Sequence, residues 1–313
     1  MNDRFITGLD NLPSSARGGV LTVGNFDGMH LGHQRILSTA RGLADADRSA
    51  VVAMTFQPTP DAVLRPRQER LRIVSHARKC ELLAGAGADW VVTVPTDMKL
   101  LGMAPEAFIQ EIILDHFAVR HIVEGDNFFF GRGRSGNVQM LADWQERGGF
   151  RLHIIEPVTL DFPGGPQRVS STMVRHLIGE GRVEDAARCL GRVFSIAGQV
   201  VAGDGRGREL NSPTANLEPG EQIVPADGVY AGRAQIAGRQ FVAAISIGNK
   251  PTLRRLDKSV VEAFLLDAGG DYYGQEMELS FVARLRDQHR FADEQALKRQ
   301  IAEDVQRVRE ICR

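Results

Sequence analysis

The chain has 313 residues, of which 43% are hydrophobic and 25% charged, and its formal net charge is −1. These values are typical of a soluble globular protein with about two domains. The near-zero net charge excludes the strongly basic surface that general nucleic-acid or membrane-surface binding requires, so we expect neither kind of partner.

Up to about residue 190, apolar runs of strand length alternate with amphipathic helical patterns. Buried strands joined by helices form parallel sheets, so this alternation predicts an α/β domain whose sheet is covered on both faces. The predicted strands are residues 20–23, 50–56, 90–95, 121–125 and 151–157. The predicted helices are residues 33–46, 76–87, 104–117 and 138–147, followed by two short helices that begin near residue 171.

The pattern changes from Val193 onward. Runs such as VFSIAGQVVAG, RQFVAAISIG and SVVEAFLLD are separated by Gly, Pro and Asp turns, and no helical pattern interrupts them. They predict a small antiparallel β-barrel or sandwich. Leu297, Ile301, Val305 and Val308 recur at helical spacing, which predicts a C-terminal amphipathic helix that covers it. We therefore expect domains at residues 1–190 and 191–313.

The stretch GNFDGMHLGH, residues 24–33, follows the first predicted strand and begins a helix. Ligands bind at the carboxyl ends of the strands in α/β sheets, and helix N-termini attract phosphate. His30 and His33 are three residues apart, and their imidazoles could donate hydrogen bonds to a nucleotide phosphate. A structural histidine or a zinc pair is the alternative, although no nearby cysteine supports zinc.

This stretch resembles the opening motif of the bacterial bifunctional riboflavin kinase/FMN adenylyltransferase family, also called FAD synthetase. VEGDNFFFG and SSTMVR resemble two later motifs of its N-terminal module, which is a Rossmann-like nucleotidyltransferase. The resemblance implies catalysis by His30 and His33, and Asn127 as a ligand of nucleotide phosphate or Mg²⁺. It also implies nucleotide-binding roles for Gly24, Phe26, Asp27, Gly28, Ser171, Thr172 and Arg175.

The chain contains no P-loop motif, so a kinase here would need another phosphate-binding segment. The glycine-rich segment GDGRGRELNSPTANL, residues 203–217, is the candidate. On an extended segment, Thr214 and Asn216 face the same side, and their hard oxygens suit Mg²⁺, although a turn is the alternative. The segment resembles the riboflavin kinase signature. That resemblance implies Mg²⁺–ATP binding by Thr214 and Asn216, and nucleotide binding by Gly207 and Arg208. Glu262 would be the general base, whereas its position in a strand fits an outward-facing residue equally well.

Two positions depart from the family pattern. TFQPTP has Thr59 where the family usually has a histidine, and Asn211-Ser212 replace the Gly-Phe that precedes P-T-A-N. The first change predicts slower adenylyl transfer if that histidine positions ATP or flavin. The second removes an apolar side chain from the expected wall of the kinase pocket, which weakens the expectation of kinase activity in the C-terminal domain.

Two other functions compete with this interpretation. Gly131–Gly136 fits G-x-G-x-x-G, which would indicate a dinucleotide-dependent oxidoreductase, but the residues DNFFFG lie between the preceding strand and the second glycine, where an immediate turn is expected. A flavin-binding regulator that has lost one or both activities is the second alternative. An oxidoreductase would consume reduced cofactor without ATP, and a regulator would bind riboflavin without converting it.

The three cysteines are scattered, and the N-terminus lacks an apolar signal core. We therefore expect a cytoplasmic protein, because disulfide frameworks and secretion signals leave other patterns. The fold class expected overall is a Rossmann-like nucleotidyltransferase domain followed by a small antiparallel β-barrel with a C-terminal helix. The expected substrates are riboflavin, FMN and ATP, with Mg²⁺ as cofactor. The oligomeric state stays open, and a weak homo-oligomer is compatible with the sequence.

Overall fold

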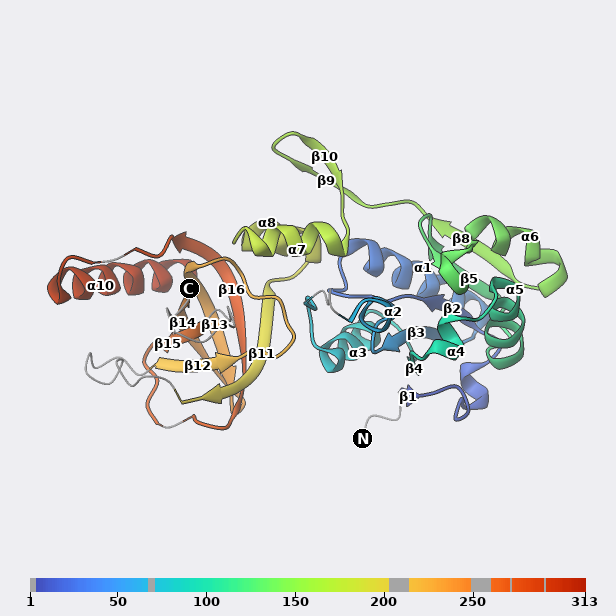
Figure 1. Cartoon of the computed structure of the whole chain (residues 1–313), viewed down its shortest axis with the longest axis horizontal. Coiled ribbons are helices and arrows are strands. Elements are labelled where there is room, and N and C mark those ends of the chain that lie inside the picture. The colour runs from blue at the N-terminus through green and yellow to red at the C-terminus, as the bar shows by residue number, and fades with distance from the viewer. Residues whose placement is uncertain (1–3, 67–70, 203–213, 249–259, 271, 290) are drawn as a thin grey trace. The chain divides into compact units, whose positions relative to one another are not determined.

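The computed structural model describes residues 4–66, 71–202, 214–248, 260–270, 272–289 and 291–313 (Figure 1). The chain folds into two compact units, Met1–Arg70 with His76–Ser170 and Leu71–Ser75 with Ser171–Arg313. The two short helices after residue 170 thus group with the second unit in the fold. The expected domain boundary at residue 190 stays a prediction about function.

The first unit is built on a parallel sheet with strand order β1-β4-β3-β2-β5-β8. Its strands are β1 (Phe5–Thr7), β2 (Val20–Val23), β3 (Val51–Gln57), β4 (Trp90–Pro95), β5 (His121–Gly125) and β8 (Arg151–Ile155). From the central pair β2 and β5, the chain runs outward through β3 to β4 toward one edge of the sheet, and from β5 to β8 toward the other edge. The carboxyl ends of β2 and β5 therefore form the topological switch point, where open α/β sheets bind ligands.

Helices cover both faces of this sheet (Figure 1). The described helices of this unit are α1 (Leu31–Asp47), α2 (Pro60–Leu64), α3 (His76–Gly85), α4 (Met98–Leu101), α5 (Pro105–Ala107), the π-helix η3 (Phe108–His116) and α6 (Val138–Gly148), with single 3₁₀ turns η1 (Ser14–Ala16) and η4 (Arg132–Arg134). One apolar cluster joins α1 and α3 to the sheet, and the other joins η3 and α6 to it. The predicted two-faced burial is confirmed, and all four residues of β2 are buried.

Several short strands were not predicted. They are β1 and the hairpins β6 (Phe129–Phe130) with β7 (Gly136–Asn137) and β9 (Thr159–Phe162) with β10 (Gly165–Arg168). Strands of two to four residues contain too few alternations to show a period of two. The segment Gly131–Gly136 connects β6 to β7 through η4, so it is a hairpin turn and not the strand-to-helix turn of a dinucleotide-binding fold.

The second unit contains a closed antiparallel barrel with strand order β11-β12-β15-β14-β13-β16. Its strands are β11 (Phe194–Val201), β12 (Thr214–Glu218), β13 (Gly228–Ile236), β14 (Arg239–Gly248), β15 (Val260–Leu265) and β16 (Glu276–Arg286). Alternate residues are buried along β14 and β15, which distinguishes an inner face from an outer one. The predicted antiparallel architecture is confirmed as a barrel.

Three helices accompany the barrel within the described part of this unit: α7 (Ser171–Gly179), α8 (Val183–Leu190) and α10 (Glu294–Ile311). The Asp293 side chain caps α10 by accepting a hydrogen bond from the backbone amide of Ala296 at 2.7 Å. Val308 and Val305 pack with residues of β13, β14 and β16, so the predicted C-terminal helix does cover the barrel. No described helix combines the length and apolarity needed to cross a bilayer.

Candidate functional site

The loop between β2 and α1 folds through three left-handed backbone positions, Phe26 (φ 48°), Gly28 (φ 81°) and Met29 (φ 44°). Residues other than glycine adopt this conformation at a cost, and such strain concentrates at functional sites. The side chains of Phe26 and Met29 offset this cost by packing into the apolar cluster beside α1. Asp27 between them is also buried. The loop is thus held rigidly at the switch point of the sheet.

His30 and His33 form a stacked pair, with ring centroids 3.7 Å apart and an interplanar angle of 22°. His30 is the N-cap of α1, and its Nδ1 accepts a hydrogen bond from the backbone amide of Gly32 at 3.2 Å. A Cβ at position 32 would lie 3.0 Å from Cε1 of His30, so the glycine between the two histidines leaves room for the ring. Gly24 likewise lies against the ring of Phe26, which a Cβ there would meet at 3.1 Å.

Both imidazoles are neutral at physiological pH. Burial, with a contribution from the nearby Arg168, lowers the pKa of His30 to about 4. Burial lowers the pKa of His33 well below its ordinary value, and the neighbouring His30 and Lys79 lower it further. Because Nδ1 of His30 accepts a hydrogen bond, the neutral ring carries its proton on Nε2. The pair can therefore donate hydrogen bonds without acting as cations.

Lys79 on α3 is a buried cation beneath this loop that the sequence analysis missed. Its Nζ donates to Oγ1 of Thr55 at 2.9 Å and to the backbone carbonyl of Phe56 at 3.4 Å, both at the carboxyl end of β3. The Thr55 hydroxyl in turn donates to the carbonyl of Asn25 at 3.4 Å. A lysine on the otherwise buried face of a helix, beside Cys80 and Leu83, was the available signal in the sequence.

The turn after β5 lies at the other side of the switch point. Asn127 is exposed in this turn, and its Oδ1 lies so close to Gly125 that a Cβ there would come within 3.2 Å. The adjacent Asp126 forms a two-pronged ion pair with Arg168 at the end of β10. Arg168 thus joins the hairpin β9–β10 to this turn. It was not predicted, because nothing local marks an arginine in a short hairpin.

Ser171, Thr172 and Arg175 lie on α7, within the second unit. Nε of Arg175 donates to the backbone carbonyl of Leu71 at 3.1 Å, which ties the segment 71–75 to this helix. These three residues are therefore part of a different unit from the histidine loop. Their nucleotide-binding role stays a prediction.

The barrel has its own group of predicted site residues. Asn216 on β12 lies directly opposite Glu262 on β15, and Thr214 lies opposite Phe264. Ala215, Leu217, Val261 and Ala263 point into the barrel, so the residues between them occupy the outer face. Thr214, Asn216 and Glu262 thus share one face, and for Thr214 and Asn216 the alternation along the strand predicted this. Asn216 is buried there, whereas Glu262 is partly exposed.

Two further predicted residues, Gly207 and Arg208, lie outside the described residues, as do Asn211 and Ser212. Thr59 is the N-cap residue of α2, where its side chain makes no capping hydrogen bond. Among the described residues, no cluster of three or more His, Cys, Asp or Glu side chains could hold a metal ion.

Comparisons with known proteins cover both units. A family model described as FAD synthetase matches residues 12–173, and a model described as riboflavin kinase matches residues 190–312. A bifunctional riboflavin kinase/FMN adenylyltransferase of Pseudomonas fluorescens is 35% identical over 309 residues, covering 99% of this chain and 98% of the relative. Its counterpart in Escherichia coli K12 is 33% identical over 312 residues, which cover 98% of this chain and 97% of that relative.

A similar fold occurs in a crystal structure described as a macrolide-efflux protein from Streptococcus pneumoniae. The TM-score is 0.88 at 26% sequence identity, and the match covers 98% of this chain and 99% of the other.

Proposed function

We propose that this chain, which belongs to the bifunctional riboflavin kinase/FMN adenylyltransferase family, has a separate centre for each of its two activities. These activities produce FMN and FAD. Adenylyl transfer takes place at the loop after β2, and riboflavin phosphorylation takes place on the outer face of the barrel at β12 and β15. The corresponding functional domains are residues 1–190 and 191–313.

In adenylyl transfer, an oxygen of the FMN phosphate attacks the α-phosphorus of ATP, and the bond to the departing pyrophosphate breaks. Negative charge builds on the oxygens of the α-phosphate and on the leaving group. His30 and His33 stabilise this charge by donating hydrogen bonds as neutral imidazoles. The observation that carries this proposal is the stacked, neutral pair at the switch point and the N-terminus of α1.

The remaining predicted residues bind the nucleotide in this proposal. Gly24, Phe26, Asp27 and Gly28 shape the loop against it, and the packing of Phe26 into the apolar cluster helps to fix the two histidines before the substrate arrives. Asn127, in the turn after β5, binds phosphate or a magnesium ion held by it. We propose that Ser171, Thr172 and Arg175 also bind nucleotide phosphate, for which their hydroxyls and guanidinium are suited.

In the kinase reaction, the 5′-oxygen of riboflavin attacks the γ-phosphorus of ATP, ADP leaves, and the hydroxyl proton passes to a base. Glu262 is that base, and Thr214 and Asn216 bind the nucleotide beside it. The direct cross-strand pairing of Asn216 with Glu262 carries this assignment, because it brings an amide ligand and a carboxylate to adjacent positions. Gly207 and Arg208 contact the phosphates.

The donor chemistry of the residues fits Mg²⁺. Thr214, Asn216 and Asn127 offer neutral hydroxyl and amide oxygens, the hard ligands that magnesium accepts alongside substrate phosphates. When bound, Mg²⁺ would neutralise charge on the phosphates at both centres. The protein residues orient the nucleotide and, at the barrel, accept the proton.

The proposal is tested by resolving flavins chromatographically after incubation with Mg²⁺–ATP. His30→Ala is expected to abolish FAD formation and preserve FMN formation from riboflavin. Glu262→Ala is expected to abolish FMN formation and preserve FAD formation from supplied FMN. Equal loss of both activities in either folded variant would contradict separate centres.

A further inference from the structure

Ser246 extends the polar row on the outer face of the barrel by one strand. Glu262 on β15 lies directly opposite Asn216 on one side and Ser246 of β14 on the other. Opposed residues of antiparallel strands share a face, with Cβ atoms about 4.5–5.5 Å apart. The Ser246 hydroxyl is therefore adjacent to the carboxylate that the kinase reaction uses.

Gln288 determines which way this hydroxyl can point. Its Nε2 donates to Oγ of Ser246 at 2.8 Å and to the backbone carbonyl of Ile247 at 3.2 Å. A hydroxyl that accepts from an amide keeps its own proton for another acceptor. Within the described residues that proton has no partner, and neither does the carboxylate of Glu262. The Ser246 hydroxyl can therefore act as donor to the neighbouring Glu262 carboxylate as acceptor.

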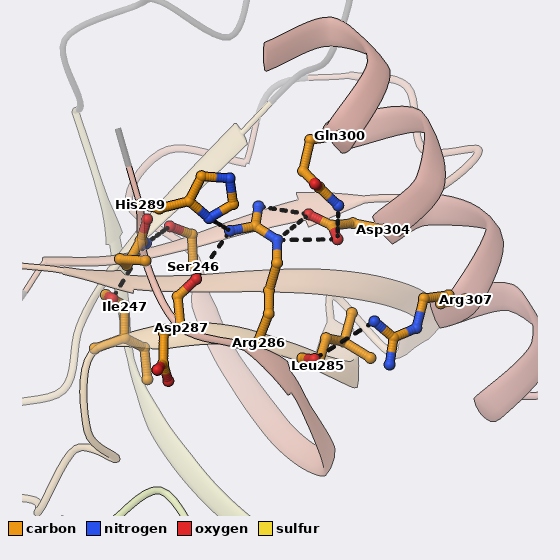
Figure 2. Close-up of polar contacts among 10 residues, drawn as sticks. Ser246, Ile247, Leu285, Arg286, Asp287, His289, Gln300, Asp304 and Arg307 are labelled. Carbon is orange, nitrogen blue, oxygen red and sulfur yellow. Dashed lines mark hydrogen bonds and ion pairs between the residues drawn. The ribbon is translucent and has the colours of Figure 1, made fainter. Parts of the chain in front are cut away.

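The segment that carries Gln288 is itself anchored to α10 (Figure 2). Arg286 donates to both carboxylate oxygens of Asp304 at 2.7–3.1 Å, and its Nη1 donates to the carbonyl of Asp287 at 3.0 Å. The same Nη1 lies 3.3 Å from Nδ1 of His289. The buried Asp304 is also held by Gln300 of α10 at 3.1 Å. Residues on both sides of Gln288 are thus fixed before substrate binds.

We propose that Ser246, oriented by Gln288, is a positioning residue for riboflavin phosphorylation that donates a hydrogen bond to the carboxylate of Glu262. This bond aims the carboxylate at the 5′-hydroxyl of riboflavin. As the new bond from the 5′-oxygen to the γ-phosphorus forms, the bond to ADP breaks and the hydroxyl proton passes to Glu262. The inference rests on the proposed role of Glu262.

The first test uses Ser246→Ala, Ser246→Thr and Gln288→Met in the full chain. Loss of one hydrogen bond to a carboxylate corresponds to about a tenfold decrease in kcat for FMN formation. Ser246→Ala is expected to show this decrease with the KM values for riboflavin and ATP unchanged, and Ser246→Thr is expected to restore the rate. Gln288→Met cannot donate to Oγ and is expected to show a smaller decrease. Thermal unfolding is the control for folding of the barrel, and unchanged FAD formation from supplied FMN shows that the other centre is unaffected.

A double-mutant cycle separates this inference from the proposed function. Ser246→Ala is expected to have no further effect on residual FMN formation in the Glu262→Ala background, because its effect passes through that carboxylate. If Glu262→Ala strongly reduces FMN formation but Ser246→Ala costs the same factor in both backgrounds, only the positioning role is overturned. If Glu262→Ala retains the full rate, the assignment of the base fails as well. An unchanged kcat in Ser246→Ala would also overturn the positioning role.

Discussion

The imidazole of His30 lies face to face with that of His33 at 3.7 Å, and both rings are held neutral by burial and by nearby cations. A pair of imidazolium ions at this separation would repel strongly, so neutrality is a condition of the stacked geometry. Two neutral rings can still present N–H groups to a phosphate. The stacked pair therefore carries no net positive charge, but its N–H groups point in fixed directions for hydrogen bonding.

The lowered pKa of His30 predicts a loss of stability on acidification. Its folded-state pKa of about 4 is below the unfolded value of 6.5, so the unfolded chain binds the extra proton between these pH values. Stability therefore falls as pH decreases through this window, by about 2 kcal/mol from this residue between pH 7 and pH 5. Urea unfolding at both pH values is expected to show a smaller decrease for His30→Asn than for the unsubstituted chain. Identical decreases would contradict the buried neutral state.

Gly32→Ala is expected to reduce FAD formation at least about tenfold and to leave FMN formation unchanged. The added Cβ would lie 3.0 Å from Cε1 of His30, so the imidazole must shift by a few tenths of an ångström relative to its cap and to His33. A misplaced catalytic group can cost up to about a hundredfold in rate. Gly42→Ala is the matched control on the same helix, because no atom lies within 4 Å of a Cβ there. That control is expected to be neutral or stabilising by up to about 1 kcal/mol.

Lys79→Met is expected to reduce FAD formation by about tenfold or more. It removes the hydrogen bonds that hold the end of β3 and, through Thr55, the carbonyl of Asn25 in the histidine loop. It also removes the cation that helps to lower the pKa of His33. The adjacent Arg78→Met is the control, because its ion pair with Glu81 is solvent-exposed and worth less than about 1 kcal/mol. Equal rates for both variants would show that Lys79 does not support this centre.

Asp304→Asn is expected to destabilise the barrel unit by about 3 kcal/mol, because it leaves the Arg286 guanidinium without its buried counter-charge. Figure 2 shows Asp304 held between Arg286 and Gln300. Asp267→Asn is the control, because its ion pair with Arg309 is solvent-exposed and should contribute little to stability. Thermal unfolding of the three proteins measures the difference. A similar, small loss in both variants would show that the buried pair is dispensable.

Sequence patterns located the long elements well, and they located short or non-local features poorly. The run Val20–Val23, the helix after it and the histidine loop were evident because burial on both faces and helical periodicity are local signals. Arg168 was missed, since its contact with Asp126 spans 42 residues and depends on a hairpin too short to show a period. Lys79 and Ser246 were missed because an isolated polar residue has no local feature that identifies its partner.

The sequence by itself determined the succession of strands and helices, the common side of Thr214 and Asn216, and the presence of two histidines at a helix start. These follow from periodicity and from chemistry within a few residues. Only the tertiary structure decided that Glu262 is flanked by Asn216 and Ser246, and that His33 lies near a buried lysine. Strand register and burial arise from the packing of segments far apart in the chain. They set the neighbours and the local dielectric on which the chemistry depends.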